Sequence, residues 1–99
     1  MKNFRTYDVA MEFYKSCQQI KIPGGALKNQ FERAVLSIPL NLAEGTVKPS
    51  AKERKRFYYT ALGSLREAQL ILELTDNRQL LTETEDMAKH LYLLCKNTR

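Results

Sequence analysis

The sequence lacks long apolar runs and has few cysteines. No apolar stretch approaches the roughly 20 residues that a membrane-spanning helix needs, so we expect a soluble, cytoplasmic protein that does not contact a membrane. The two cysteines, Cys17 and Cys95, belong to no C-x-x-C motif and to no cluster of cysteine and histidine, which argues against metal binding. We interpret both as reduced thiols of the core and expect no cofactor.

Recognisable catalytic motifs are also missing. The chain has no G-x-S-x-G, no H-E-x-x-H and no glycine-rich phosphate loop. The one histidine, His90, has no partner in its sequence neighbourhood and is interpreted as a surface or boundary residue. Glu44 and Glu67 could face each other from neighbouring helices, but carboxylate-bridged metal centres use Glu-x-x-His pairs, and neither glutamate begins one. We therefore expect no enzymatic activity.

Glycine and proline are sparse, at four and three residues, and they divide the chain into four segments with helical spacing. Helices are predicted over residues 7–20, 26–45 and 50–76, and from residue 82 onward. Ser50 and Glu53 predict a capping box at the start of the third helix. Thr82 and Glu85 predict a second capping box at the start of the fourth.

The connections between these segments are short, about five residues each, which favours antiparallel neighbours. The predicted fold class is therefore all-α, an up-down-up-down four-helix bundle formed as a single domain by residues 1–99. Pro39 removes one backbone hydrogen bond from the second helix. Because the apolar stripe continues from Val35 to Leu42, we expect the helix to bend at Pro39 and to end near Gly45.

The first three predicted helices carry more apolar residues than one small bundle can bury. The additional apolar residues lie away from the main stripe of each helix. They are Val9, Phe13, Leu36, Leu40 and Leu62. Self-association would cover them, so we predict that they form the interface of a homo-oligomer. Singly scattered, exposed apolar residues are the alternative interpretation.

A line of polar residues runs beside the apolar stripe of the second predicted helix. Serine and asparagine are mediocre helix formers, so their presence indicates short side chains held at a helix interface. The predicted members are Arg33, Ser37, Asn41 and Glu44, with Ser64 and Glu67 on the third helix. We interpret them as a buried polar network that fixes the register of the two helices. A pocket for a small ligand is the alternative.

Positive charge is concentrated at the start of the third predicted helix. Sixteen Lys and Arg stand against eleven Asp and Glu, a formal net charge of +5. Cations at a helix start oppose the helix dipole, which favours an anionic partner there. The predicted contacts to nucleic acid are Lys48, Lys52, Arg54, Lys55, Arg56 and Tyr59, with Tyr58 also nearby for base stacking. Solvated surface charge is the alternative.

Several of these motifs together resemble the 23S rRNA intervening-sequence proteins, a family of four-helix bundles. The most specific is the S-I-P-x-N-[IL]-A-E-G run, which stands here at residues 37–45. Further matches, spread over nearly the whole chain, are Phe4, Tyr7, Ala10, Gln30, Arg33, Ala34, Gly63, Ser64, Leu65 and Glu67. In this family tryptophan is usual at the place of Tyr7. The basic residues are not part of a fixed motif.

The resemblance implies a left-handed up-down-up-down bundle that assembles as a ring-like homopentamer without enzymatic activity. Members of this bacterial family are encoded in insertions within large-subunit rRNA genes, among other places. They are similar to the accessory proteins of diversity-generating retroelements, which are basic pentamers that bind nucleic acid and a reverse transcriptase. The resemblance thus adds a reverse transcriptase or another protein to the expected partners.

Two functions from different classes follow. The first is a non-enzymatic homo-oligomer that binds the backbone of RNA or DNA through its basic residues. The alternative is a protein-interaction scaffold or accessory subunit that does not bind nucleic acid.

Overall fold

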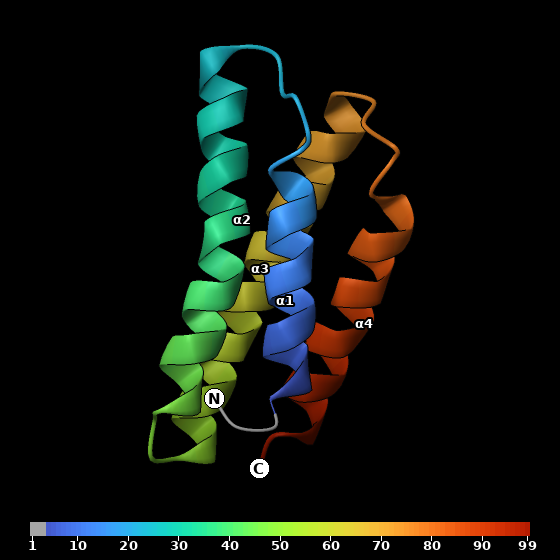
Figure 1. The fold of residues 1–99 in the computed structure, drawn as a ribbon. Helices are drawn as coiled ribbons and strands as arrows, with labels where there is room; N and C mark the ends of the chain where they lie inside the picture. The colour runs from blue at the N-terminus through green and yellow to red at the C-terminus, as the bar shows by residue number, and fades with distance from the viewer. Residues whose placement is uncertain (1–3) are drawn as a thin grey trace.

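Four α-helices follow one another in the computed structural model, which describes residues 4–99 of the chain. They are α1 (Arg5–Cys17), α2 (Gly25–Thr46), α3 (Ala51–Leu74) and α4 (Leu81–Asn97). Each helix packs against the next, and α1 also packs against α4, so the four close into a bundle (Figure 1). The helices alternate in direction. The predicted all-α, up-down-up-down four-helix bundle is confirmed.

The core of the bundle lies where the apolar stripes of the four helices meet. On α2 the buried residues recur every three or four positions, which keeps them on one side of the helix. The largest side chains with almost no exposure are Val35, Ile38, Leu42, Leu65, Met87 and Leu91. Burial of each such side chain contributes roughly 1.5–3 kcal/mol, so these residues hold α2, α3 and α4 together, and buried Ala10, Phe13 and Cys17 add α1 to the same core.

Pro39 lies within α2 and does not end it. The helix continues for seven more residues, to Thr46, and Pro39 is itself buried. Because proline has no N–H, the carbonyl oxygen of Val35 lacks its usual donor within the helix. Figure 1 shows the green C-terminal half of α2 inclined to its blue-green first half, as expected for a helix that bends at proline.

Gly45 has a different role from the one predicted. It lies inside α2 rather than just past its end, and it is buried. A Cβ atom at this position would lie 2.7 Å from Cε1 of Tyr58 and 3.1 Å from Cβ of Phe57. Helices α2 and α3 thus approach each other too closely at this point for a larger residue. The reason for glycine is packing, not a helix terminus.

One of the two predicted capping boxes is present in half, because the side chain of Ser50 caps the helix, whereas Glu53 binds the Ser50 hydroxyl and not its backbone N–H. The backbone N–H of Glu53 donates to Oγ of Ser50 at 3.1 Å, and the Ser50 hydroxyl donates to Oε1 of Glu53 at 3.2 Å. The predicted box at Thr82 and Glu85 is wrong, because α4 begins at Leu81 without a side-chain cap. Leu80, which precedes α4, is buried in the core, so apolar packing places this helix start.

We predict opposite effects of alanine at two glycines inside helices. Gly45→Ala should destabilise the protein by about 1–3 kcal/mol, because its methyl group overlaps the ring of Tyr58. Gly63→Ala is the matched control: nothing lies within 4 Å of an added Cβ there, so the better helix former should stabilise by up to about 1 kcal/mol. Urea denaturation measures both. Equal effects of the two substitutions would contradict the close approach at Gly45.

Candidate nucleic-acid interface

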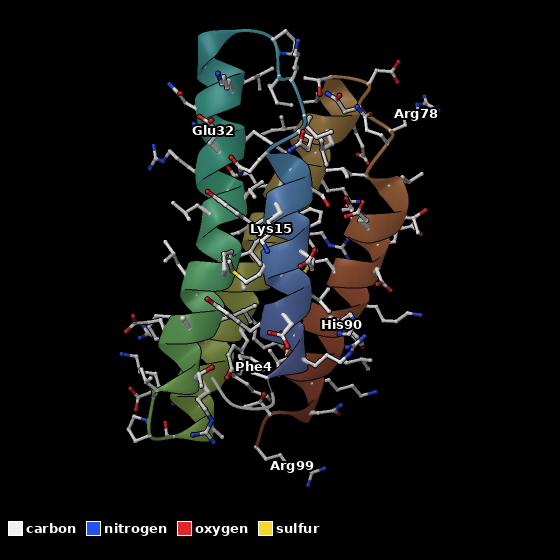
Figure 2. All side chains as sticks on the ribbon, viewed as in Figure 1. Phe4, Lys15, Glu32, Arg78, His90 and Arg99 are labelled. Atoms are coloured by element: carbon white, nitrogen blue, oxygen red, sulfur yellow. The ribbon has the colours of Figure 1, made fainter. Side chains whose placement is uncertain are left out.

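Eight of the fifteen lysines and arginines of residues 4–99 gather at one end of the bundle. This end contains the first turns of α1 and α3 and the last turns of α2 and α4 (Figure 1). Figure 2 shows Phe4 and Arg99 at this end and Arg78 toward the opposite one. We term it the basic end; its described cations are Arg5, Lys48, Lys52, Arg54, Lys55, Arg56, Lys96 and Arg99. The acidic residues among these turns are Asp8, Glu44 and Glu53.

Arg54 holds two segments of backbone together. Its Nη1 donates to the carbonyl oxygen of Lys48 at 3.1 Å, and its Nη2 donates to the carbonyl oxygen of Arg99 at 3.1 Å. The first bond fixes the α2–α3 loop, and the second fixes the end of the chain beside α3. Both Nη atoms of Arg54 therefore form hydrogen bonds within the protein. Arg54 adds positive charge to this end but is less available than its neighbours for direct contact with a ligand.

Phe57 lies between two of the predicted cations. Nζ of Lys48 and Cζ of Arg56 each lie 5.1 Å from the centre of its ring, a distance at which a cation is attracted to the aromatic face. Lys48 also forms an ion pair with Glu44 at 3.0 Å. This pair removes Glu44 from the predicted polar network and neutralises part of the charge of Lys48.

The cations best placed for an external partner are Lys52, Lys55 and Arg56. Lys52 and Arg56 are exposed and Lys55 is half-buried, and none of the three forms an ion pair with another residue of 4–99. Tyr59 is 54% exposed, as base stacking requires. Tyr58 is buried against the core and cannot stack on a base, which corrects the expectation that both rings are available.

Sequence reasoning missed the contribution of α4 to this end. Because α3 and α4 are antiparallel neighbours, the last turn of α4 lies beside the first turns of α3. Lys96 and Arg99 therefore join the basic end, and the exposed Tyr92 lies one turn before Lys96. The short α3–α4 connection was the signal for this proximity, because it makes the two helices antiparallel neighbours. The sequence prediction used only the run of cations near residue 52, which belongs to one helix.

Three of the six residues of the predicted polar network are hydrogen-bonded to one another. Oγ of Ser37 and Oγ of Ser64 lie 2.7 Å apart and join α2 to α3. Nδ2 of Asn41 donates at 2.8 Å to both the carbonyl oxygen and Oγ of Ser37. Arg33 and Glu67 are exposed and instead line a shallow pocket of about 280 Å³ above the two serines. The network is therefore smaller than predicted.

The predicted oligomer interface is also reduced. Phe13 is only 2% exposed and packs in the core of its own bundle, so its assignment to the interface was wrong. Val9 and Leu62 are half-buried and pack against the same core. Leu36 and Leu40 are 44% and 58% exposed on α2, and they remain available to a second molecule. Helical spacing alone could not tell which apolar residues α4 would cover.

The buried thiols do not form a reactive site. Both cysteines are free and buried, as expected. Burial, together with the negative charge of Glu83, raises the pKa of Cys17 to about 12, so its reactive thiolate is scarce at neutral pH. Cys17 lines a hollow of about 690 Å³ under the α1–α2 loop, at the end opposite the basic end. Residues 4–99 contain no group of three metal-ligating side chains.

No helix among the described residues is long and apolar enough to cross a membrane. The fold and the charge distribution define a class, the small all-α bundles with one basic end. Within that class the chain belongs to the 23S rRNA-intervening sequence protein family, whose family model matches residues 2–99. Comparison with curated proteins and with solved structures found no match.

We predict that the Ser37–Ser64 contact stabilises the α2–α3 interface modestly. Ser64→Ala should lower the free energy of unfolding by about 1 kcal/mol, because the hydroxyl of Ser37 loses its partner across the interface. The double variant Ser37→Ala/Ser64→Ala should cost less than the sum of the two single variants, because each single variant already breaks the bond between the hydroxyls, while Asn41 keeps its bond to the carbonyl oxygen of residue 37 in every variant. A double-mutant cycle by urea denaturation tests this pairing; additive losses would show that the hydroxyls are not coupled.

Proposed function

We propose that this protein is a non-enzymatic, homo-oligomeric bundle that binds the backbone of RNA or DNA through its basic end. The observation that carries the proposal is the gathering of cations from α1, the α2–α3 loop, α3 and the C-terminal part of the chain at that end. Phosphates attract such a surface through charge alone and release counterions when they bind. Binding should therefore tolerate changes of base sequence and weaken steeply as salt rises. We further propose that the protein acts in the bacterial cytoplasm, as the family resemblance suggests.

The arrangement of side chains supports contact rather than mere solvation. Lys52 and Arg56 are exposed and Lys55 is half-buried on the first turns of α3, where the start of the helix adds partial positive charge. Arg54 and Lys48 stiffen the loop that precedes them through their bonds to the backbone and to Glu44. A rigid basic surface loses less conformational entropy on binding than a flexible one does.

Self-association forms the second part of the proposal, with five copies in the ring that the family resemblance suggests. Exposed Leu36 and Leu40 on α2 supply the apolar part of the interface, and α3 adds exposed Leu70 and Leu74. An oligomer repeats the basic end in every copy. Several weak contacts to one nucleic acid then combine through avidity, without any increase in the affinity of a single copy.

A protein-interaction scaffold is the second candidate function. The same exposed leucines on α2 favour it, since an apolar face can accept another protein, a reverse transcriptase among others, as well as a second copy. The two candidates differ in whether the isolated protein is a single monodisperse oligomer, in which these leucines are covered, or a monomer that leaves them exposed.

We predict that the position of the cations, and not the net charge of the protein, determines its affinity for RNA. The triple variant Lys52→Gln, Lys55→Gln and Arg56→Gln should lose most of its affinity for RNA at low salt. It should also reduce the slope of log affinity against log salt by about two to three. The control variant Lys15→Gln, Lys21→Gln and Lys28→Gln removes the same charge from exposed positions outside the basic end and should bind almost as the parent does.

Electrophoretic shift with structured RNA at low and moderate salt measures both triple variants. Equal losses in the two would show that binding follows net charge alone. No shift of the unmodified protein at micromolar concentration and low salt would refute nucleic-acid binding.

We predict a mass of about five times 11.5 kDa in light scattering. Leu36→Lys/Leu40→Lys should reduce this mass, because buried lysines in an interface lose their hydration. Gln19→Lys adds charge at an exposed position outside the helices and serves as the control that should keep the parent mass. A monomeric parent protein would contradict self-association and favour the scaffold.

A further inference from the structure

We propose that the basic end binds single-stranded nucleic acid, with bases stacked on Tyr59 and Tyr92. This inference rests on the proposed function and specifies the form of nucleic acid that it recognises. It starts from two rings that the bundle leaves exposed, 54% for Tyr59 on α3 and 57% for Tyr92 on α4. The other tyrosines and all phenylalanines of the described residues are buried or half-buried.

The two tyrosines lie at about the same level of the bundle. The bond between Nη2 of Arg54 and the carbonyl oxygen of Arg99 places the start of α3 beside the end of α4. Tyr59 is five residues beyond Arg54, and Tyr92 is seven residues before Arg99. Within the helices, at ~1.5 Å per residue, Tyr59 lies about 7.5 Å beyond Arg54 and Tyr92 about 7.5 Å before Asn97, where α4 ends, so both rings lie within about two turns of the basic end.

Both tyrosines also lie on the sides of their helices that adjoin each other. Glu73 of α3 and Leu81 of α4 line the same hollows between the two helices, so each faces the other helix. Tyr59 precedes Glu73 by 14 residues, and Tyr92 follows Leu81 by 11. At about 100° per residue these separations return to nearly the same side of a helix, so the two rings flank the α3–α4 contact.

Cations accompany each ring. On α3, Lys55 lies one turn before Tyr59, and on α4, Lys96 lies one turn after Tyr92. Tyr59 and Tyr92 form no hydrogen bond or ring contact with another residue of 4–99. Basic residues beside exposed aromatic rings are the combination by which proteins bind single strands without sequence preference.

A duplex cannot use these rings. Its base faces are covered by neighbouring base pairs, so a protein that binds duplex by charge alone contacts phosphate and sugar. The tyrosines would then contribute little, and only the lysines and arginines would matter. The effect of removing a ring therefore distinguishes single-strand recognition from simple attraction to phosphate.

Fluorescence anisotropy of labelled oligonucleotides of about 12 nucleotides tests the inference. The probes are oligouridylate, oligodeoxythymidylate and an RNA duplex of the same length. Tyr59→Ala and Tyr92→Ala should each weaken binding of oligouridylate by about fivefold to a hundredfold. Tyr59→Phe and Tyr92→Phe keep the ring and should bind as the parent does. All four variants should bind the duplex within about twofold of the parent.

The two oligonucleotide probes separate the sources of a single strand. Similar tyrosine-dependent binding of both assigns the site to RNA and DNA alike, whereas tyrosine-dependent binding of oligouridylate alone assigns it to RNA. Either pattern supports stacking, because the ring supplies the affinity in both.

Three results would overturn the inference, and they separate it from the proposed function. Duplex binding with no tyrosine dependence for oligouridylate would leave nucleic-acid binding intact and refute stacking. A changed light-scattering mass in the alanine variants would show that the rings lie between copies of the protein. A parent protein that binds none of the probes at low salt would refute the proposed function together with the inference.

Discussion

The close approach of α2 and α3 at Gly45 is the constraint on which the rest of this structure depends. Without a Cβ at Gly45, the ring of Tyr58 packs directly on α2, and the two long helices stay together down to the loop that joins them. The serine pair farther along the same interface holds their register. This contact positions the first turn of α3, and with it the cations of the basic end, against a rigid support.

The concentration of cations at the basic end costs electrostatic free energy, and contacts within the fold offset part of that cost. Like charges at this end repel one another, and cations at the start of α3 also oppose its dipole. Contacts to the Phe57 ring, the ion pair of Lys48 with Glu44 and the bonds of Arg54 to backbone carbonyls each reduce that cost. Among residues 4–99, Lys52 and Lys55 lack such partners, and an anionic ligand bound beside them would reduce the remaining repulsion.

Much of the fold could be predicted from the sequence, because helical periodicity and sparse glycine and proline act locally. The helix through Pro39 followed from an apolar stripe that continues past it. The role of Gly45 could not be predicted, since a helix C-terminus and a close helix contact both favour glycine. Likewise, burial of Phe13 and Tyr58 depends on which neighbouring helix covers them, and the contribution of α4 to the basic end depends on tertiary proximity.

The central claim, that nucleic acid contacts the basic end, is tested most directly by amide NMR shifts during titration with oligouridylate at low salt. The account predicts shifts concentrated in residues 48–59 and 92–99, with little change near Pro23 or Arg78 at the opposite end. Shifts that cluster around Pro23 and Arg78, or that spread evenly over the bundle, would contradict it.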